Sequence, residues 1–531
     1  MKKYLGWITL AALCACSSGG GATPPAPGAD AGTPEADAGP DPVVGRPGRG
    51  ITLSVVDAGS PAFVLQGKTL DVKLKLERQI ASAGAVTVTV KGLPKDATSA
   101  GVVIPAGALE GTLTIQSAAA TPQGPSDVVL EAAESDGSLA SAKLPLFVRG
   151  APGTLDTTFA KAGVYSPIFG ALLGALASDA VPLDEGKTLI GGRRINTVSV
   201  TRLGADGVLD ATFAGGGIQD VASRQGELRV AQQPATSAKK GFVSVLEIGS
   251  TPSLHMLAPN GQLDTGFNGN GKRVLDVGPA GLIIGNDIHV LPNGKILVLA
   301  VYGGLPGGKG LGVSRWNLDG SLDTTYGSNP PGFCAITVAG TGSTSLNGGF
   351  MLPSADGSVR VVAVAASAAP TSIVKGCTAT GALDTTLGAA PDHVWDLGAL
   401  VTDATREADG TMTALTADAW YRYNSAGVLD QSIGNVGKVT VSTTAQLAAV
   451  RVQADKKVLV AGGEGPAFKL FRFLPTGSLD PSFGTAGVLS VDVAPDNTAE
   501  LKRLTLLPDD RALLVGTRND LPDGAVVRLW R

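Results

Sequence analysis

The stretch GSLDPSFGTAGV, residues 477–488, recurs in closely related form seven times along the chain and decides the fold. Each copy opens with a glycine, carries Leu-Asp at its third and fourth positions, and has an aromatic or aliphatic residue three positions after the aspartate. The copies begin at Gly153, Gly207, Gly261, Gly320, Gly381, Gly427 and Gly477. Successive copies lie 54, 54, 59, 61, 46 and 50 residues apart, and such a self-similar period indicates a repeat architecture.

The segments between two copies of this motif predict four short strands. After Gly437 they read KVTVS, LAAVRVQ, KVLVAGG and FKLFRF, with a hairpin signal between the second and third. Four antiparallel strands per unit, repeated seven times, predict an all-β fold with a seven-bladed β-propeller over residues 151–531. An open solenoid is the alternative, but closure leaves fewer free strand edges. No extra N-terminal strand that would complete the last blade is evident.

The repeat has a family resemblance. The order of a QPDG-like hairpin followed by RL-x-x-x-G-x-LD-x-x-FG-x-x-G resembles the bacterial delta-sixty repeat family of predicted β-propellers, over about residues 151–531. The resemblance implies a propeller fold and a surface location, and it brings no general activity.

The N-terminal segment has the features of a targeting signal. Lys2 and Lys3 precede the short apolar run 5–13, and the sequence Leu-Cys-Ala-Cys that ends at Cys16 resembles a bacterial lipobox. The resemblance implies a signal peptide over 1–16 and diacylation of Cys16, which anchors the chain in a membrane. Ser17 then suggests the outer membrane by the enteric sorting rule. An ordinary secretory signal, cleaved nearby, is the alternative.

Two further regions precede the repeats. Residues 17–50 are rich in Gly, Ala and Pro and have almost no large apolar residue, so they predict a disordered tether. Residues 51–150 alternate apolar and polar side chains and predict an antiparallel β-sandwich. The stretch IPAGALEGTLTI resembles bacterial immunoglobulin-like surface domains, which favours an immunoglobulin-like spacer over a binder. The strand candidates begin at residues 51, 70, 86, 102, 112, 127 and 143.

The repeated aspartates predict structural turns. Each is followed by a short polar or small residue, a pattern typical of Asx-turns in which the carboxylate accepts backbone N–H bonds. They are Asp156, Asp210, Asp264, Asp323, Asp384, Asp430 and Asp480. Calcium binding is the sharper alternative, but the residue before the leading glycine varies too much for a ligand. The sequence therefore predicts no metal site and no cofactor.

Catalytic signals are weak. No HExxH, GxSxG or P-loop pattern occurs, and His255, His289 and His393 lie apart without ligand spacing. Cys334 and Cys377 lie within one repeat interval and form a possible disulfide in an oxidising compartment. A net charge of −4 gives no field that favours nucleic acid.

These observations predict a lipid-anchored protein of the cell envelope, exposed at the surface. We expect its propeller to be a non-catalytic binding, adhesion or scaffold module, with no catalytic residue assigned. The expected partners are the membrane, through the anchor, and an unidentified envelope protein or glycan, but no nucleic acid. The alternative is a hydrolase or lyase with its site at the central axis, and it predicts charged side chains gathered there.

Overall fold

The computed structural model describes residues 50–531 apart from short gaps. The gaps are residues 57, 80–81, 167–174, 195, 223–225, 249–251, 276–281, 306–307, 329, 337–345, 366–370, 389, 391–392, 495–497 and 519–522. The expected signal peptide, Cys16 and nearly all of the expected tether therefore lie outside the described residues. No helix in the described part of the chain is long and apolar enough to cross a membrane.

The first part of the chain is a two-sheet β-sandwich. Its sheets have the strand orders β1-β3-β7-β5 and β2-β9-β8-β4-β6. The strands are β1 (Ile51–Val56), β2 (Ala62–Leu65), β3 (Thr69–Arg78), β4 (Val86–Lys91), β5 (Ala97–Thr98), β6 (Val102–Ile104), β7 (Glu110–Ser117), β8 (Gly124–Glu134) and β9 (Leu139–Arg149). All seven expected strands are present, and β2 and β5 are additional.

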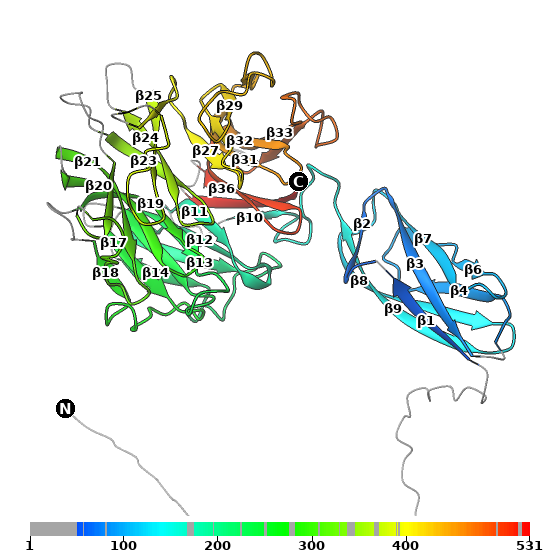
Figure 1. Cartoon of the computed structure of the whole chain (residues 1–531). Coiled ribbons are helices and arrows are strands. Elements are labelled where there is room, and N and C mark those ends of the chain that lie inside the picture. The colour runs from blue at the N-terminus through cyan, green and yellow to red at the C-terminus, as the bar shows by residue number, and fades with distance from the viewer. Residues whose placement is uncertain are drawn as a thin grey trace, which may run out of the picture.

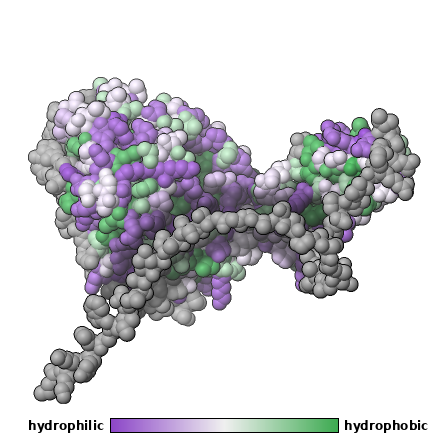
Figure 2. All heavy atoms as spheres, turned by 90° about the horizontal axis from the view of Figure 1, so that it is seen from below, coloured by the Kyte–Doolittle hydropathy of each residue, from purple (hydrophilic) through white to green (hydrophobic). Residues whose placement is uncertain are grey.

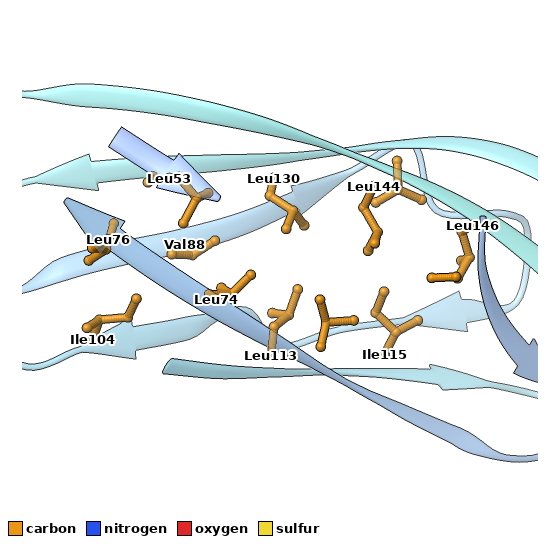
Figure 3. Close-up of a cluster of buried hydrophobic side chains, with 14 of the residues drawn as sticks. Leu53, Leu74, Leu76, Val88, Ile104, Leu113, Ile115, Leu130, Leu144 and Leu146 are labelled. Carbon is orange, nitrogen blue, oxygen red and sulfur yellow. The ribbon is translucent and has the colours of Figure 1, made fainter. Parts of the chain in front are cut away.

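The sandwich core follows from alternation along these strands. In β3 the residues Val72, Leu74 and Leu76 are buried while their polar neighbours are exposed. Since successive side chains of a strand point to opposite faces, each sheet offers one apolar face. Figure 3 shows Leu74 between the two sheets, close to Leu113 and Leu130. This part of the chain thus has its own hydrophobic core.

The described residues from 151 onward form seven four-stranded antiparallel sheets, typical of a β-propeller, and one short 3-10 turn at Asp184–Gly186. We number the sheets along the chain. Sheet 1 has β11 (Leu176–Pro182), β12 (Thr188–Arg194), β13 (Thr197–Leu203) and β14 (Ile218–Ala222); sheet 2 has β15 (Glu227–Gln232), β16 (Val243–Ile248), β17 (Ser253–Leu257) and β18 (Lys272–Val274); sheet 3 has β19 (Leu282–Val290), β20 (Ile296–Leu305), β21 (Gly308–Trp316) and β22 (Phe333–Ile336); sheet 4 has β23 (Leu346–Pro353), β24 (Val359–Ala365), β25 (Thr371–Cys377) and β26 (Trp395–Asp396).

The remaining three sheets follow the same pattern. Sheet 5 has β27 (Asp403–Arg406), β28 (Met412–Leu415), β29 (Ala419–Tyr423) and β30 (Lys438–Thr440); sheet 6 has β31 (Gln446–Val452), β32 (Val458–Glu464), β33 (Ala467–Phe473) and β34 (Val488–Asp492); sheet 7 has β35 (Ala499–Leu506), β36 (Arg511–Arg518), β37 (Asp523–Trp530) and β10 (Val164–Tyr165). The first strand of each sheet contacts the first strand of the next, and β35 contacts β11. These seven strands therefore line a common axis, as the sheets of Figure 1 do around the centre of the larger part.

Sheet 7 is completed from both ends of the repeat region, residues 151–531. The short strand β10 pairs antiparallel with β37, and Val164 is paired with Val527. The sequence showed no N-terminal strand for this purpose, and that reading was wrong. A two-residue strand is too short to give an alternating pattern.

The sequence repeat and the sheet are out of phase by one strand. The segment KVT after Gly437, here β30, pairs with β29 in sheet 5. The next three strands of the same sequence repeat, β31, β32 and β33, belong to sheet 6. The four strands that the sequence groups into one unit are thus divided between two sheets. Each sequence repeat consequently ties two neighbouring sheets together.

The sandwich contacts sheet 7 through one glutamine, one ion pair and an aromatic pair, Phe147 and Trp530, whose ring centroids are 6.2 Å apart. Gln123 Oε1 accepts hydrogen bonds from Trp530 Nε1 (2.8 Å) and from the backbone N–H of Thr157 (2.9 Å). The guanidinium of Arg149 lies 2.7 Å from a carboxylate oxygen of Asp510. The sandwich therefore contacts both the last strand, β37, and the first motif copy, which meet at sheet 7.

Candidate functional site

The repeated aspartates form the turn that the sequence predicts. In each copy Oδ1 accepts the backbone N–H two residues later, as between Asp480 and Ser482 at 3.0 Å. The equivalent acceptors are Asp156, Asp210, Asp264, Asp323, Asp384 and Asp430. In six copies a Ser or Thr hydroxyl two residues on also donates to Oδ1. This geometry is an Asx-turn.

The second carboxylate oxygen accepts from an arginine of the third strand of the same sheet. Arg315 Nε donates to Asp323 Oδ2 at 2.6 Å, and its Nη1 donates to the carbonyl of Ala379 in the next repeat at 2.8 Å. Its guanidinium also lies 4.6 Å from the ring centroid of Tyr326. The same ion pair joins Arg202 to Asp210, Arg472 to Asp480 and Arg528 to Asp156. The aspartate and arginine therefore clip one sheet to the next.

Successive motif turns are also joined through their backbones. Ala160 donates its N–H to the carbonyl of Asp206, just before the leading Gly207 of the next copy. Corresponding bonds run from Ala214 to Asn260, Asn268 to Asp319, Gly327 to Thr380, Gly434 to Thr476 and Gly484 to Pro152. Gly207 has φ +76°, and a Cβ there would lie 2.6 Å from the N atom of Ala160. The leading glycine is thus needed both for its conformation and for this close approach.

A second charged cluster lies on the inner strands. The first strand of each sheet has one residue at an equivalent height along the axis, three positions before the last residue that pairs with the second strand. These seven residues are Asp179, Arg229, Asp287, Phe350, Asp403, Ala449 and Arg503. Arg503 Nε donates to Asp179 Oδ1 at 2.7 Å, and Arg451 Nη1 donates to Asp403 Oδ2 at 2.6 Å. Charged side chains therefore gather at the axis.

The three axial aspartates also bond to the neighbouring sheet. The backbone N–H of Val230 donates to Asp179 Oδ2 (3.0 Å), and that of Val450 donates to Asp403 Oδ2 (2.9 Å). Asp287 Oδ2 accepts from the N–H of Met351 at 2.8 Å. The carboxylates of sheets 1, 3 and 5 are thus acceptors that hold sheets 2, 4 and 6 at the axis.

The pKa values at the axis follow from burial and charge. Burial raises the pKa of Asp287, against the opposing effects of Arg503 and of the Met351 N–H. The carboxylates of Asp179 and Asp287 raise the pKa of Arg503, which keeps the guanidinium charged. The arrangement is a neutralised charge network that can fix strands or orient a charged ligand.

A cavity of about 470 Å³ opens where the inner strands of sheets 1, 2 and 7 begin. Because strands alternate in direction, this is the end opposite to the motif turns, which follow the third strands. Its lining includes the cations Arg193 and Lys502 and the carboxylates Glu227 and Glu500. Sequence reasoning missed this site and the axial cluster, because only the register brings these residues together.

The three histidines belong to different sheets. His255 is fully buried on β17, with Nε2 3.4 Å from Glu247 Oε2. His289 is on the inner strand β19, and burial lowers its pKa to about 4. His393 has φ +47° and lies in the segment before β26. Among the described residues, no group of three or more His, Cys, Asp or Glu could hold a metal ion.

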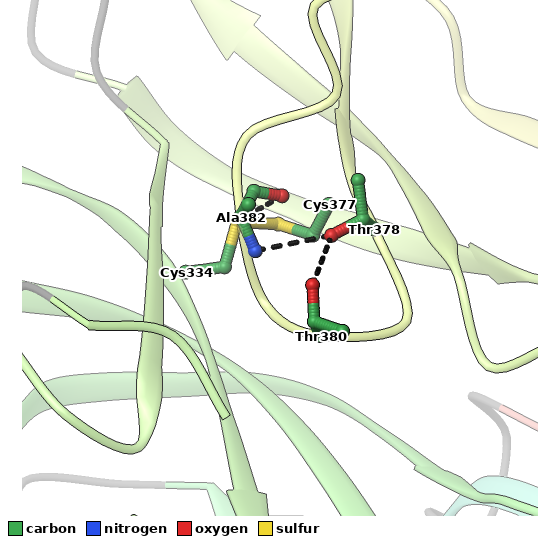
Figure 4. The surroundings of a disulfide bond; sticks show 5 residues. All are labelled: Cys334, Cys377, Thr378, Thr380 and Ala382. Carbon is green, nitrogen blue, oxygen red and sulfur yellow. Dashed lines mark hydrogen bonds between the residues drawn. A yellow bond between two sulfur atoms is a disulfide. The ribbon is translucent and has the colours of Figure 1, made fainter. Parts of the chain in front are cut away.

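Cys334 of β22 and Cys377 of β25 form a disulfide. It joins sheets 3 and 4 beside the motif turn of residues 378–384 (Figure 4). The hydroxyl of Thr378 accepts the N–H of Ala382 there at 3.1 Å. Cys377 holds the place that Trp316 and Phe473 hold in other sheets, since all three form a bridge with the leucine of the next motif.

The comparisons with known proteins concern the propeller. The model of a domain of unknown function described as a β-propeller, DUF5122, matches residues 453–483, which include the last motif turn. No curated protein matched the chain.

Several solved structures are similar in part. A gluconolactonase from Xanthomonas campestris is 12% identical with a TM-score of 0.32, over 59% of this chain and 92% of that one. The β-propeller domain of the trilobed protease from Pyrococcus furiosus is 7% identical with a TM-score of 0.36, over 66% and 95%. A leech intramolecular trans-sialidase is 10% identical with a TM-score of 0.33, over 87% and 93%. At these values the likenesses carry no argument about activity. The chain is an all-β protein with the sheets of a β-propeller, and one of its repeats matches a β-propeller family of unknown function.

Proposed function

We propose that this chain is a lipid-anchored protein of the cell surface whose propeller binds an envelope protein or a glycan without catalysing a reaction. In this proposal the propeller has seven blades of the delta-sixty kind, and the sandwich is an immunoglobulin-like spacer. The anchor is a lipid on Cys16, the membrane is the outer membrane, and residues 17–50 are the tether.

One observation carries the binding role. The carboxylates of the motif turns and of the axis are engaged by backbone N–H groups and, for most of them, by arginine or lysine, so they serve as ties between sheets. The cavity at the start of the inner strands of sheets 1, 2 and 7, which we call the axis-mouth cavity, has charged side chains of both signs instead. Some of them, such as Glu500 and Lys502, are partly open to solvent. A rigid ring with a charged hollow at one end suits recognition of a polar partner.

The anchor is tested by metabolic labelling with a fatty acid that carries an alkyne. Cys16→Ser abolishes the label, and the matched variant Cys14→Ser keeps it. If both variants keep the label, the anchor assignment is wrong. Protease treatment of intact cells then reports surface exposure, since a surface-exposed head is cleaved before the cells are broken.

Binding is tested with the full-length lipoprotein in detergent on a glycan array and against purified envelope proteins. Lys502→Ala reduces binding at least severalfold, whereas Lys143→Ala, on the exposed face of the sandwich, leaves it unchanged. Equal loss in both variants, or no binding to any envelope component, contradicts the proposal.

A second candidate is a hydrolase or lyase at the axis, and the contact between Arg503 and Asp179 beside Asp287 favours it. It predicts turnover of a substrate that Asp287→Asn abolishes. Turnover that survives this substitution excludes the axis as its site.

A further inference from the structure

The hairpin between the first and second strands of most sheets supplies a cation to the motif aspartate. Lys295 Nζ lies 2.6 Å from Asp323 Oδ2, and Arg511 Nη1 lies 2.8 Å from Asp156 Oδ2. The other such pairs are Lys187 with Asp210 (3.6 Å), Lys457 with Asp480 (3.3 Å) and Lys239 with Asp264. Five sheets thus fill one place beside the carboxylate with a cation of their own.

Sheets 4 and 5 depart from this pattern. In sheet 4 Ser358 takes the hairpin position. The charges of Arg360 and Arg406 interact with Asp384 instead.

In sheet 5 the exception is of another kind. Thr411 takes the hairpin position, and within the described residues no ion pair reaches Asp430. The hydrogen bonds of Asp430 go to Oδ1, from the N–H and hydroxyl of Ser432. Arg422, at the place of Arg315, makes no ion pair with it, and its buried Nε and Nη2 have no hydrogen-bond partner. Asp430 therefore keeps its turn without an ion pair to either cation, and its pKa is lowered by the bonds from Ser432 and, to a smaller extent, by the charge of Arg422.

A cavity of about 600 Å³ lies at this place. Its lining includes Thr411, Arg422, Asn424, Asp430 and Gln431. The backbone around Asp430 matches the other copies, since its N–H donates to the carbonyl of Arg422 at 2.8 Å as that of Asp480 does to Arg472. The acceptor is thus held as in sheet 6, where Lys457 approaches Asp480.

We infer that the cavity beside Asp430 binds a primary ammonium group in the place that Lys295 and Lys457 occupy in sheets 3 and 6. The nearby Arg422 does not oppose this, because Asp323 accepts from both Arg315 and Lys295. The ammonium belongs either to a small amine or to an exposed lysine of a partner protein. A partly exposed carboxylate binds a single ammonium weakly, because solvent screens exposed ion pairs.

The inference goes beyond the proposed function, because this site lies at the motif-turn end of the sheets and the axis-mouth cavity lies at the other. Failure of either site leaves the other standing. The probe is cadaverine, followed by saturation-transfer NMR on the full-length lipoprotein in detergent. Its N,N′-diacetylated form, which has no charge, is the control probe.

Three variants decide the outcome. Thr411→Lys fills the place and abolishes saturation transfer to cadaverine, and Asp430→Asn does the same while keeping the Asx-turn acceptor. Lys457→Thr empties the equivalent place beside Asp480 and adds a second site, so the saturation-transfer amplitude rises about twofold over wild type. Transfer that is equal for cadaverine and the diacetylated probe, or unchanged by Thr411→Lys, overturns the inference.

A lysine-rich peptide distinguishes the two sources of the ammonium group. Tighter binding per amine than cadaverine, lost in Thr411→Lys, identifies a protein lysine as the preferred ligand. Equal binding per amine identifies a small amine. Either result supports the site, and absence of both interactions contradicts it.

Discussion

The backbone N–H of Gly484 donates to the carbonyl oxygen of Pro152 at 3.0 Å, which joins the last copy of the repeated motif to the first. The first and last strands of the repeat region, β10 and β37, also pair in sheet 7. The contact between β11 and β35 closes the same circle at the axis. Closure therefore rests on three separate contacts between segments that are distant in the sequence.

Replacing Gly153 by alanine tests this closure. Gly153 has φ +77°, and a Cβ would lie 2.2 Å from the N atom of Gly484. Gly215→Ala is the matched control, because Gly215 has φ +72° but no atom within 4 Å of its Cβ position. We expect Gly153→Ala to lower the free energy of unfolding by about 1–3 kcal/mol more than the control. Urea unfolding followed by tryptophan fluorescence measures it, and equal losses would show that the contact is not tight.

Asp156 and Asp430 offer a matched pair for the ion-pair clip. Asp156 is fully buried against Arg528 and Arg511, whereas Asp430 has only its turn bonds. Asp156→Asn keeps an acceptor but leaves the buried guanidinium of Arg528 without its counter-charge, at a cost of about 3–5 kcal/mol, whereas Arg511 keeps its ion pair with Asp509. Asp430→Asn costs about 0.5 kcal/mol or less. Thermal and urea unfolding of both variants compare the two costs, and similar values would contradict the clip.

The same aspartates predict acid sensitivity. Burial opposes ionisation of Asp480, but Ser482, Arg472 and Lys457 outweigh it and lower its pKa to about 2. A carboxyl whose pKa is lower in the folded state stabilises the fold above its unfolded pKa, about 3.9, and this stabilisation is lost as the pH falls to about 2. We expect the melting temperature to be nearly constant from pH 7 to 5 and to fall steeply below about pH 4. Asp480→Asn flattens that fall, which differential scanning calorimetry can measure.

The disulfide predicts a redox-dependent stability. Cys334 and Cys377 are 43 positions apart, and closing a loop of that length is worth up to about 4 kcal/mol in the chain-entropy account. Cys334→Ala is expected to lower the melting temperature, and so is dithiothreitol treatment of the wild type. The double variant Cys334→Ala/Cys377→Ala is the control, since it lacks both cysteines of this disulfide. Dithiothreitol should leave its melting temperature unchanged, and a further fall would show that the thiol reagent acts elsewhere.

Local sequence was enough for most strands and for the motif turn. The alternation in β3 and the Leu-Asp of residues 479–480 each depend on neighbours in the chain, so they are visible without a structure. The strand β10 and the phase shift between repeat and sheet were not visible, because both depend on pairing with distant segments.

The candidate sites were less accessible to sequence reasoning. Arg503 in sheet 7 and Asp179 in sheet 1 are far apart in the sequence. They meet only because the inner strands of these two sheets are neighbours. The site at Asp430 could have been found in part, since Ser358 and Thr411 stand where other repeats have hairpin cations such as Lys295 and Lys457. That signal becomes meaningful once those cations are seen to contact the motif aspartate.

The joint at Gln123 and Arg149 determines how a pulling force would pass through the protein. Tension applied before residue 50 crosses the sandwich and reaches sheet 7, where Gln123 holds Trp530 and the first motif copy together. The force is thereby distributed over the first motif copy and β37 before it can separate β10 from β37. On the opposite side of the ring, the disulfide links sheets 3 and 4 covalently. A pulling force therefore acts on a ring of sheets that is reinforced at two opposite places, the joint at sheet 7 and the disulfide.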